Sequence, residues 1–136
     1  MLILPGGQGW ESGVNTEAAE KAREFVATGV PVAAICAATL GLARAGLLDD
    51  LGHTSNAPEY LAASGYRGAR LYRNVPATTD RNITTATGIA PVDFAYEIFK
   101  VLSLYSGPAL EAWYALFKFA EGVQGGGAEQ GGGRLV

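Results

Sequence analysis

The sequence is poor in the residues that build disulfide frameworks or metal cages, because it contains one cysteine and one histidine. A single cysteine cannot form an internal disulfide, and a free thiol suits a reducing compartment. A zinc cage takes about four cysteine or histidine ligands, so we expect no metal site. Gly6 and Gly7 are not followed by the Gly-Lys-Ser/Thr of a phosphate loop, so we also expect no cofactor.

Long apolar runs and blocks of one charge are also missing. No apolar stretch reaches the roughly 18 residues that a membrane span needs, and Met1 opens without the basic and apolar regions of a signal peptide. The net charge is −3 and no basic run is present, which argues against nucleic acid or an anionic membrane as a partner. We therefore expect a cytoplasmic protein.

What the sequence does contain is enough apolar material for one packed domain. Hydrophobic residues make up 49% of the 136 residues and charged residues 17%, which is typical of a folded chain. Short apolar runs alternate with amphipathic stretches, a pattern that predicts a parallel sheet with helices on both faces. We predict strands at 2–4, 31–35 and 83–86, and helices at 16–28, 37–45, 91–104 and after Gly107-Pro108.

The intervening segments are less regular. The pattern predicts a short strand at 52–56, a helical turn at 58–64 and an extended edge segment at 70–78. The chain opens in a strand that would need a partner on each side, so we expect two further βα units upstream. A late start codon, a fragment and a remodelled fold all stay open. We assign residues 1–122 to one partial domain and 123–136 to a flexible glycine-rich tail.

Cys36 lies where a predicted strand ends and the next helix begins. The positive end of a helix dipole favours a thiolate there, and a thiolate is both a nucleophile and an oxidation sensor. Ligands of a parallel sheet bind at the carboxyl ends of its strands, where the Gly6-Gly7 loop leaves its own strand. The amides of Gly7 and Ala37 are therefore candidates for an oxyanion site. The alternative is that Cys36 is simply a small buried apolar residue.

Several segments in order carry a resemblance to a known family. They are Leu2 to Gly7 with Trp10, Ala34 to Ala38, Ala45 to Asp49, Thr54, Asp80 to Ala86, and Gly88 to Glu97. Over roughly residues 2–104 the sequence resembles the ThiJ/PfpI family of the class I glutamine amidotransferase-like superfamily. The resemblance implies a flavodoxin-like domain, commonly dimeric, with a cysteine on a nucleophile elbow. Family members include amidase-like or protease-like hydrolases, glyoxalases, deglycases, chaperones and redox sensors.

The sequence departs from this family at the partners of the cysteine. Family enzymes usually pair it with a histidine, which directly follows the cysteine in one branch and lies two residues past the position of Thr54 in another. Those two places are Ala37 and Asn56 here. Asn56 can orient the thiol through a hydrogen bond, but it cannot take a proton at neutral pH. The family's glutamate that contacts the cysteine belongs to an N-terminal part that this sequence lacks.

Other candidate residues have simpler interpretations. We expect His53 to be a strand-end residue satisfied by the backbone rather than a general base, because it should lie at the opposite edge of the sheet from Cys36. Trp10 is a candidate pocket wall, packing residue or dimer contact. Asp93 and Glu97 lie one turn apart, which we interpret as a solvated helix face rather than a catalytic pair.

The remaining notable residues form two groups. The aromatic side chains of the last helix should cover the core, or form a dimer surface if an upstream half is missing: Trp113, Tyr114 and Phe117. The arginines of the loop-rich middle should lie at the surface, with binding of a carboxylate substrate or a partner as the alternative: Arg67, Arg70, Arg73 and Arg81.

These features support three hypotheses. The first is a cysteine-dependent hydrolase or amidotransferase-like protein that acts on a small amide or carbonyl substrate and forms a homodimer. Its site would comprise Cys36 as nucleophile, Asn56 as orienting residue, and Gly6, Gly7, Ala37 and Trp10 around the oxyanion and the substrate. The second is a non-catalytic redox or stress-response protein whose thiolate oxidises. The third is a truncated, inactive remnant.

Overall fold

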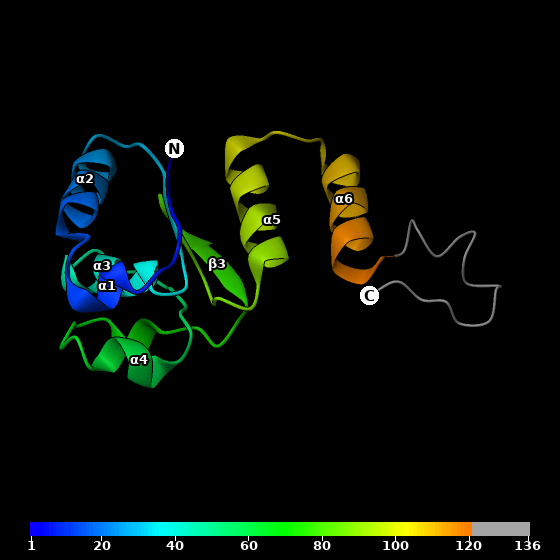
Figure 1. The fold of residues 1–136 in the computed structure, drawn as a ribbon. Coiled ribbons are helices and arrows are strands. Elements are labelled where there is room, and N and C mark those ends of the chain that lie inside the picture. The colour runs from blue at the N-terminus through cyan, green and yellow to red at the C-terminus, as the bar shows by residue number, and fades with distance from the viewer. Residues whose placement is uncertain (121–136) are drawn as a thin grey trace.

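A four-stranded sheet forms the centre of the molecule, in a computed structural model that describes residues 1–120 (Figure 1). The strand order is β1-β2-β4-β3, and β1, β2 and β4 run parallel. The strands comprise β1 (Leu2–Leu4), β2 (Val32–Ile35), β3 (Ala77–Asp80) and β4 (Ile83–Ala86). The three strands predicted from apolar runs are therefore confirmed. The predicted edge segment at 70–78 becomes a strand only from residue 77, and it pairs antiparallel with β4.

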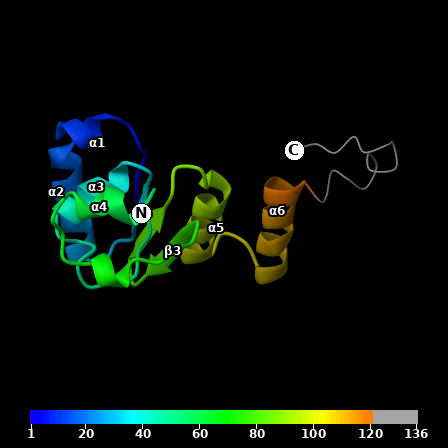
Figure 2. The same ribbon diagram turned by 90° about the horizontal axis from the view of Figure 1, so that it is seen from below.

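Helices cover both faces of this sheet. Figures 1 and 2 show α1 to α4 on one side and α5 on the other, with α6 standing outside α5. The bounds are α1 (Gly9–Ser12), α2 (Thr16–Ala27), α3 (Ala38–Arg44), α4 (Pro58–Ala62), the 3-10 helix η1 (Ala69–Leu71), α5 (Pro91–Leu102) and α6 (Gly107–Phe119). No helix within these 120 residues is long and apolar enough to cross a membrane. The fold is the predicted α/β, flavodoxin-like arrangement.

Two apolar clusters hold the layers together. The larger one lies between the sheet, α2 and α3, where small residues such as Ala22 and Ala38 are fully buried and let the helices approach closely. The smaller one joins Ala33 and Ala86 to Phe94 and Ile98 of α5. Because successive residues of β2 point to opposite faces, one strand serves both clusters. This explains why its sequence is apolar throughout.

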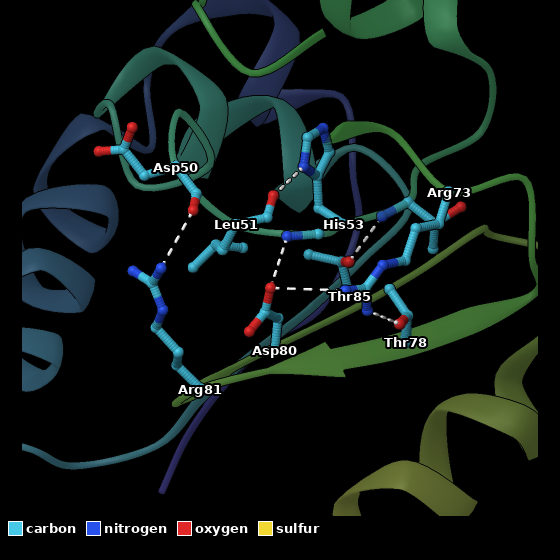
Figure 3. Close-up of polar contacts among 10 residues, drawn as sticks. Asp50, Leu51, His53, Arg73, Thr78, Asp80, Arg81 and Thr85 are labelled. Carbon is cyan, nitrogen blue, oxygen red and sulfur yellow. Dashed lines mark hydrogen bonds and ion pairs between the residues drawn. The ribbon is translucent and has the colours of Figure 1, made fainter. Parts of the chain in front are cut away.

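The predicted strand at 52–56 is wrong, because side chains replace the ladder there. Only His53 forms a bridge, to Tyr72. The Gly52 amide donates to Asp80 Oδ2 at 2.7 Å, and the Thr54 amide donates to Thr85 Oγ1 at 2.9 Å. Figure 3 shows the two accepting side chains, Asp80 and Thr85. The segment therefore lies beside the sheet without joining it as a regular strand.

The helix pair α5–α6 also differs from expectation. Asp93 accepts hydrogen bonds from Tyr114 and Lys118, and Glu97 accepts from Thr79 of β3 at 2.7 Å. These carboxylates therefore fasten elements together, and the interpretation as a solvated face is wrong. The aromatic face of α6 packs on α5 rather than on the sheet: the Trp113 ring lies 4.8 Å from that of Phe99. Phe117 stays 59% exposed.

Candidate functional site

The carboxyl ends of three parallel strands converge on Cys36. β2 ends at Ile35 and leads directly into it, while β1 leads into the loop at Gly6 and β4 into the loop at Gly88. Because β2 lies between β1 and β4, Cys36 is the central residue of this edge and the two glycine loops flank it. This is the edge where parallel sheets bind their ligands.

The backbone at Cys36 is strained. Its φ is 60°, in the left-handed region that costs a non-glycine residue about 1–3 kcal/mol. The surrounding bonds hold it there: its amide donates to Ala86 O at 3.0 Å, and its carbonyl accepts from the Thr39 amide at 3.1 Å and the Thr39 hydroxyl at 2.6 Å. Such strain concentrates at functional sites.

Two glycines leave room for the cysteine side chain. A Cβ added at Gly6 would lie 2.9 Å from Cys36 Cβ, and one added at Gly88 would lie 2.8 Å from Cys36 Sγ. Real Cβ atoms essentially never approach so closely, so any side chain at either position would have to displace the cysteine. Gly88 is a site residue that was not predicted from the sequence. The pattern that could have indicated it is its position two residues after a strand, which Gly6 shares.

Asn56 contacts the cysteine directly. Its Nδ2 donates to Cys36 Sγ at 3.5 Å, while its Oδ1 accepts from the Gly88 amide at 2.9 Å. The backbone N–H of Gly88 can only donate, so it fixes which end of the Asn56 amide faces the sulfur. The sulfur therefore receives a hydrogen bond, which fixes its direction.

Polar contacts on both sides hold the segment that carries Asn56. Ser55 Oγ lies 2.7 Å from Thr39 Oγ1, which in turn bonds the Cys36 carbonyl. Thr54 Oγ1 donates to Val75 O at 2.8 Å. Hydrogen bonds thus link the placement of Asn56 to the same helix start that presents the cysteine.

Asp80 and two arginines anchor the beginning of this segment. Asp80 Oδ2 accepts from the Gly52 amide, and the Arg73 guanidinium lies 3.5 Å from the same oxygen. Figure 3 shows the Asp80 and Arg73 side chains facing each other. Arg81 donates to the Asp50 carbonyl at 3.3 Å (Figure 3). Arg73 and Arg81, two of the four arginines noted in the sequence, therefore make contacts that stabilise the fold.

His53 is buried in the same region and holds both its ring nitrogens in structural contacts. Nδ1 lies 2.8 Å from Leu51 O, as Figure 3 shows, and Nε2 lies 2.8 Å from Tyr66 Oη. Burial lowers the pKa of His53 below its usual value of 6.5 and outweighs the opposing hydrogen bond to the Leu51 carbonyl. His53 is therefore a neutral structural residue, as the sequence indicated, and neither nitrogen is aimed at Cys36.

Trp10 supports the glycine loop from behind. It is 5% exposed, its indole packs on Gly41 of α3, and Nε1 donates to Pro5 O at 2.9 Å. The structure thus places Trp10 as a packing residue that anchors the loop. Its ring also lines a cavity of about 130 Å³, but Cys36 and Gly7 are not in the wall of that cavity. The neighbouring Glu11 accepts a hydrogen bond from Tyr60 of α4 at 3.0 Å.

The pKa of the Tyr60 phenol is raised by burial and by nearby charges. Its pKa rises to about 12, first through burial, then through the bond to Glu11 and the charges of Glu11 and Cys36, against Arg44. The phenol therefore stays protonated at neutral pH.

The predicted oxyanion amides remain available as donors. Within residues 1–120, neither the Gly7 nor the Ala37 amide donates a hydrogen bond to another group. Gly7 has a φ of 141°, and nothing lies within 4 Å of a Cβ built on it. The glycine loop thus leaves open space beside its amide.

A cavity of about 460 Å³ adjoins Asn56. That volume falls in the usual range of small-molecule sites. Loops after α3, η1 and β4 form it together with the first residue of α4 and one side chain of α6: Thr54, Ser55, Asn56, Ala57, Pro58, Tyr72, Asn74, Val75, Pro76, Thr87, Ile89, Ala90 and Lys118. Asn56 is therefore shared between the cavity and the sulfur of Cys36.

Comparison with known proteins gives a family match over most of the chain. The model of the DJ-1/PfpI family matches residues 1–101. Two proteins of Bacillus subtilis (strain 168), both described as uncharacterized proteases, are similar in sequence. YoaZ is 40% identical over 120 residues, and YdeA is 32% identical over 104 residues. The aligned parts cover 87% and 75% of this chain, but 57% and 52% of the two relatives.

Solved structures match in the same way. The thiJ/pfpI family protein from Bacillus anthracis superposes with a TM-score of 0.84 at 41% identity, over 88% of this chain and 57% of that one. The DJ-1 superfamily protein Atu0886 from Agrobacterium tumefaciens gives a TM-score of 0.75 at 39% identity, over 85% and 63%. The chain thus spans little more than half the length of most of these relatives.

Proposed function

Because the chain belongs to the DJ-1/PfpI family, we propose that it carries the nucleophile of a cysteine-dependent hydrolase or amidotransferase-like protein acting on a small amide or carbonyl compound. The observation that carries this proposal is the geometry of Cys36. The residue is strained, flanked by two glycines, and hydrogen-bonded through Sγ to Asn56. The protease names of both Bacillus relatives agree with it.

The proposed reaction uses the nucleophile-elbow chemistry of thiolates. Cys36 Sγ attacks the substrate carbonyl carbon, and the oxygen that becomes negative accepts hydrogen bonds from the Gly7 and Ala37 amides. The carbon–nitrogen bond then breaks, and the leaving amine takes a proton from a water molecule, which becomes hydroxide. This hydroxide attacks the thioester carbonyl carbon, and the carbon–sulfur bond breaks, which releases the acid and restores the thiolate. Asn56 orients the sulfur throughout but cannot accept a proton from it.

Hydrolysis of 4-nitrophenyl acetate and an acyl 4-nitroanilide, released as chromophores, tests this proposal. We expect Cys36→Ala to abolish turnover of both compounds, and Tyr105→Phe, an exposed residue between α5 and α6, to leave it unchanged. Turnover that survives Cys36→Ala would refute the proposal.

A second variant tests the missing base directly. Asn56→His places an imidazole beside the sulfur, where the structure has an amide that cannot accept a proton. We expect the hydrolytic rate to rise at least about tenfold, because general base catalysis contributes factors of this size or larger. No gain would mean that removal of the thiol proton does not limit the rate.

A redox role is the second candidate, and the lack of a neighbouring base favours it. Oxidation needs only a thiolate with a hydrogen-bond donor, and Asn56 Nδ2 provides one. The thiolate would attack a peroxide oxygen, the O–O bond would break, and sulfenic acid and hydroxide would form. Mass spectrometry after mild peroxide treatment should detect the added oxygen on Cys36. An unmodified thiol, under conditions that oxidise a reference low-pKa cysteine, would count against this role.

The remaining expectations stay predictions. We expect a small-molecule substrate and a homodimer, and sedimentation of the purified chain would establish its oligomeric state. The hypothesis of an inactive remnant predicts association through unpaired strand edges. A monomer that unfolds cooperatively would argue against that hypothesis.

A further inference from the structure

Among residues 1–120, one charged side chain lines the cavity beside Asn56, Lys118 of α6. We propose that this cavity is the binding site of a small organic acid, whose carboxylate lies on Lys118 and whose reactive end faces Asn56 and Cys36. The inference rests on the proposed function and names the substrate class of the same site. Three features support it: the position of Lys118 on α6, the N–H donors of its ammonium that are not used within the structure, and the apolar residues that line the rest of the cavity.

Lys118 is held in place by α5. Its Nζ lies 2.7 Å from Asp93 Oδ2, and Tyr114 Oη donates to Oδ1 of the same carboxylate at 2.5 Å. Burial opposes ionisation of Asp93, but the bonds from Lys118 and Tyr114 outweigh it and lower the pKa of the carboxyl. The carboxylate is therefore charged at neutral pH and fixes the end of α6 against the cavity.

The ammonium of Lys118 keeps capacity for a ligand. An ammonium has three N–H donors, and within residues 1–120 the structure uses one of them, on Asp93. Its side chain is 33% exposed and belongs to the cavity wall, whereas Asp93 does not line the cavity. A carboxylate in the cavity can thus accept from the remaining donors of Lys118 while Asp93 keeps the first.

The rest of the lining suits an apolar body with a polar reacting group. Six of the side chains are apolar: Ala57, Pro58, Val75, Pro76, Ile89 and Ala90. Ile89 is 91% exposed, so a ligand that covers it removes apolar surface from water. The polar residue Asn56 lies toward the cysteine, because its Nδ2 contacts Sγ. Thr87 directly follows Ala86 of β4, whose carbonyl accepts from the Cys36 amide. A carboxylate, an apolar linker and a carbonyl together match this order.

Protection of Cys36 from iodoacetamide tests the inference with two probes of one shape, 4-phenylbutyrate and 4-phenylbutanamide. Alkylation of the full chain is followed by mass spectrometry at increasing probe concentration. We expect the acid to protect with a dissociation constant about two- to fivefold lower than the amide, since partly exposed charge pairs contribute at that level. Lys118→Gln should make the two probes equal, and Lys118→Arg should keep the preference.

Lys100→Gln is the matched control, because Lys100 is a helix lysine paired with Glu97 that does not line the cavity. It should keep the preference for the acid. Equal protection in the natural sequence, a preference that survives Lys118→Gln, or no protection by either probe would overturn the inference. The protection measurement needs no turnover, so the two proposals can fail separately. Hydrolysis that survives Cys36→Ala refutes the proposed function, whereas a missing preference for the acid refutes the inference about the cavity.

Discussion

Replacement of Gly88 by alanine should block the cysteine with little effect on the rest of the fold. Gly88 is outside the left-handed region, so an added methyl group brings no backbone strain of its own. The methyl carbon would lie 2.8 Å from Cys36 Sγ, 3.1 Å from Cys36 Cβ and 3.3 Å from Asn56 Oδ1. Since ordinary contacts begin near 3.5 Å, the sulfur has to move by roughly half an ångström or more.

That displacement is large for this site. The Asn56 Nδ2 to Sγ distance is already 3.5 Å, so the hydrogen bond that orients the sulfur should be lost. We expect Gly88→Ala to lower the rate of Cys36 alkylation by iodoacetamide at least about tenfold, since small misplacements of a reacting group have effects of this size. The free energy of unfolding should fall by only about 1–3 kcal/mol, as for other overpacked sites.

The assay is alkylation at fixed pH, followed by the mass of the intact chain, with urea unfolding in parallel. Gly107→Ala is the control, because nothing lies within 4 Å of a Cβ added at that position. It should leave the alkylation rate unchanged. If Gly88→Ala reacts as fast as the natural sequence while remaining folded, the argument that Gly88 makes room for the sulfur is refuted.

Two predictions concern pH. The pKa of His53 is lowered in the folded state, so its contribution to stability is present above 6.5 and is lost as pH falls below that value. Urea unfolding should therefore show stability falling by at most about 1.4 kcal/mol per pH unit between pH 7 and 5, and His53→Gln should remove this slope. The pKa of Asp93 is also lowered, so its contribution is present above 3.8 and is lost as pH falls toward the folded-state value. Asp93→Asn should cost about 1–2 kcal/mol at pH 7 and much less at pH 3; an equal cost at both would contradict the role of its charge.

The sequence by itself determined the elements and the place of the cysteine. Apolar runs of three to five residues between amphipathic stretches can only be buried as strands covered by helices, so β1, β2 and β4 followed from local pattern. The position of Cys36 at a strand-to-helix junction is a local property too. Asn56 was accessible only through the family resemblance, since no local pattern links it to a residue 20 positions earlier.

Only the tertiary structure decided which groups meet the sulfur. Gly88 reaches Cys36 because β4 pairs beside β2, and strand order is not written in either strand. The segment at 52–56 failed as a predicted strand because Thr85 and Asp80 side chains compete for its amides. The placement of α6 was also decided by tertiary contacts. Its aromatic face was predicted to cover the core, but it packs on α5. The Asp93 carboxylate of α5 binds Lys118, which places this cation in the cavity wall. Contacts between residues far apart in the chain depend on packing, and local periodicity carries no information about them.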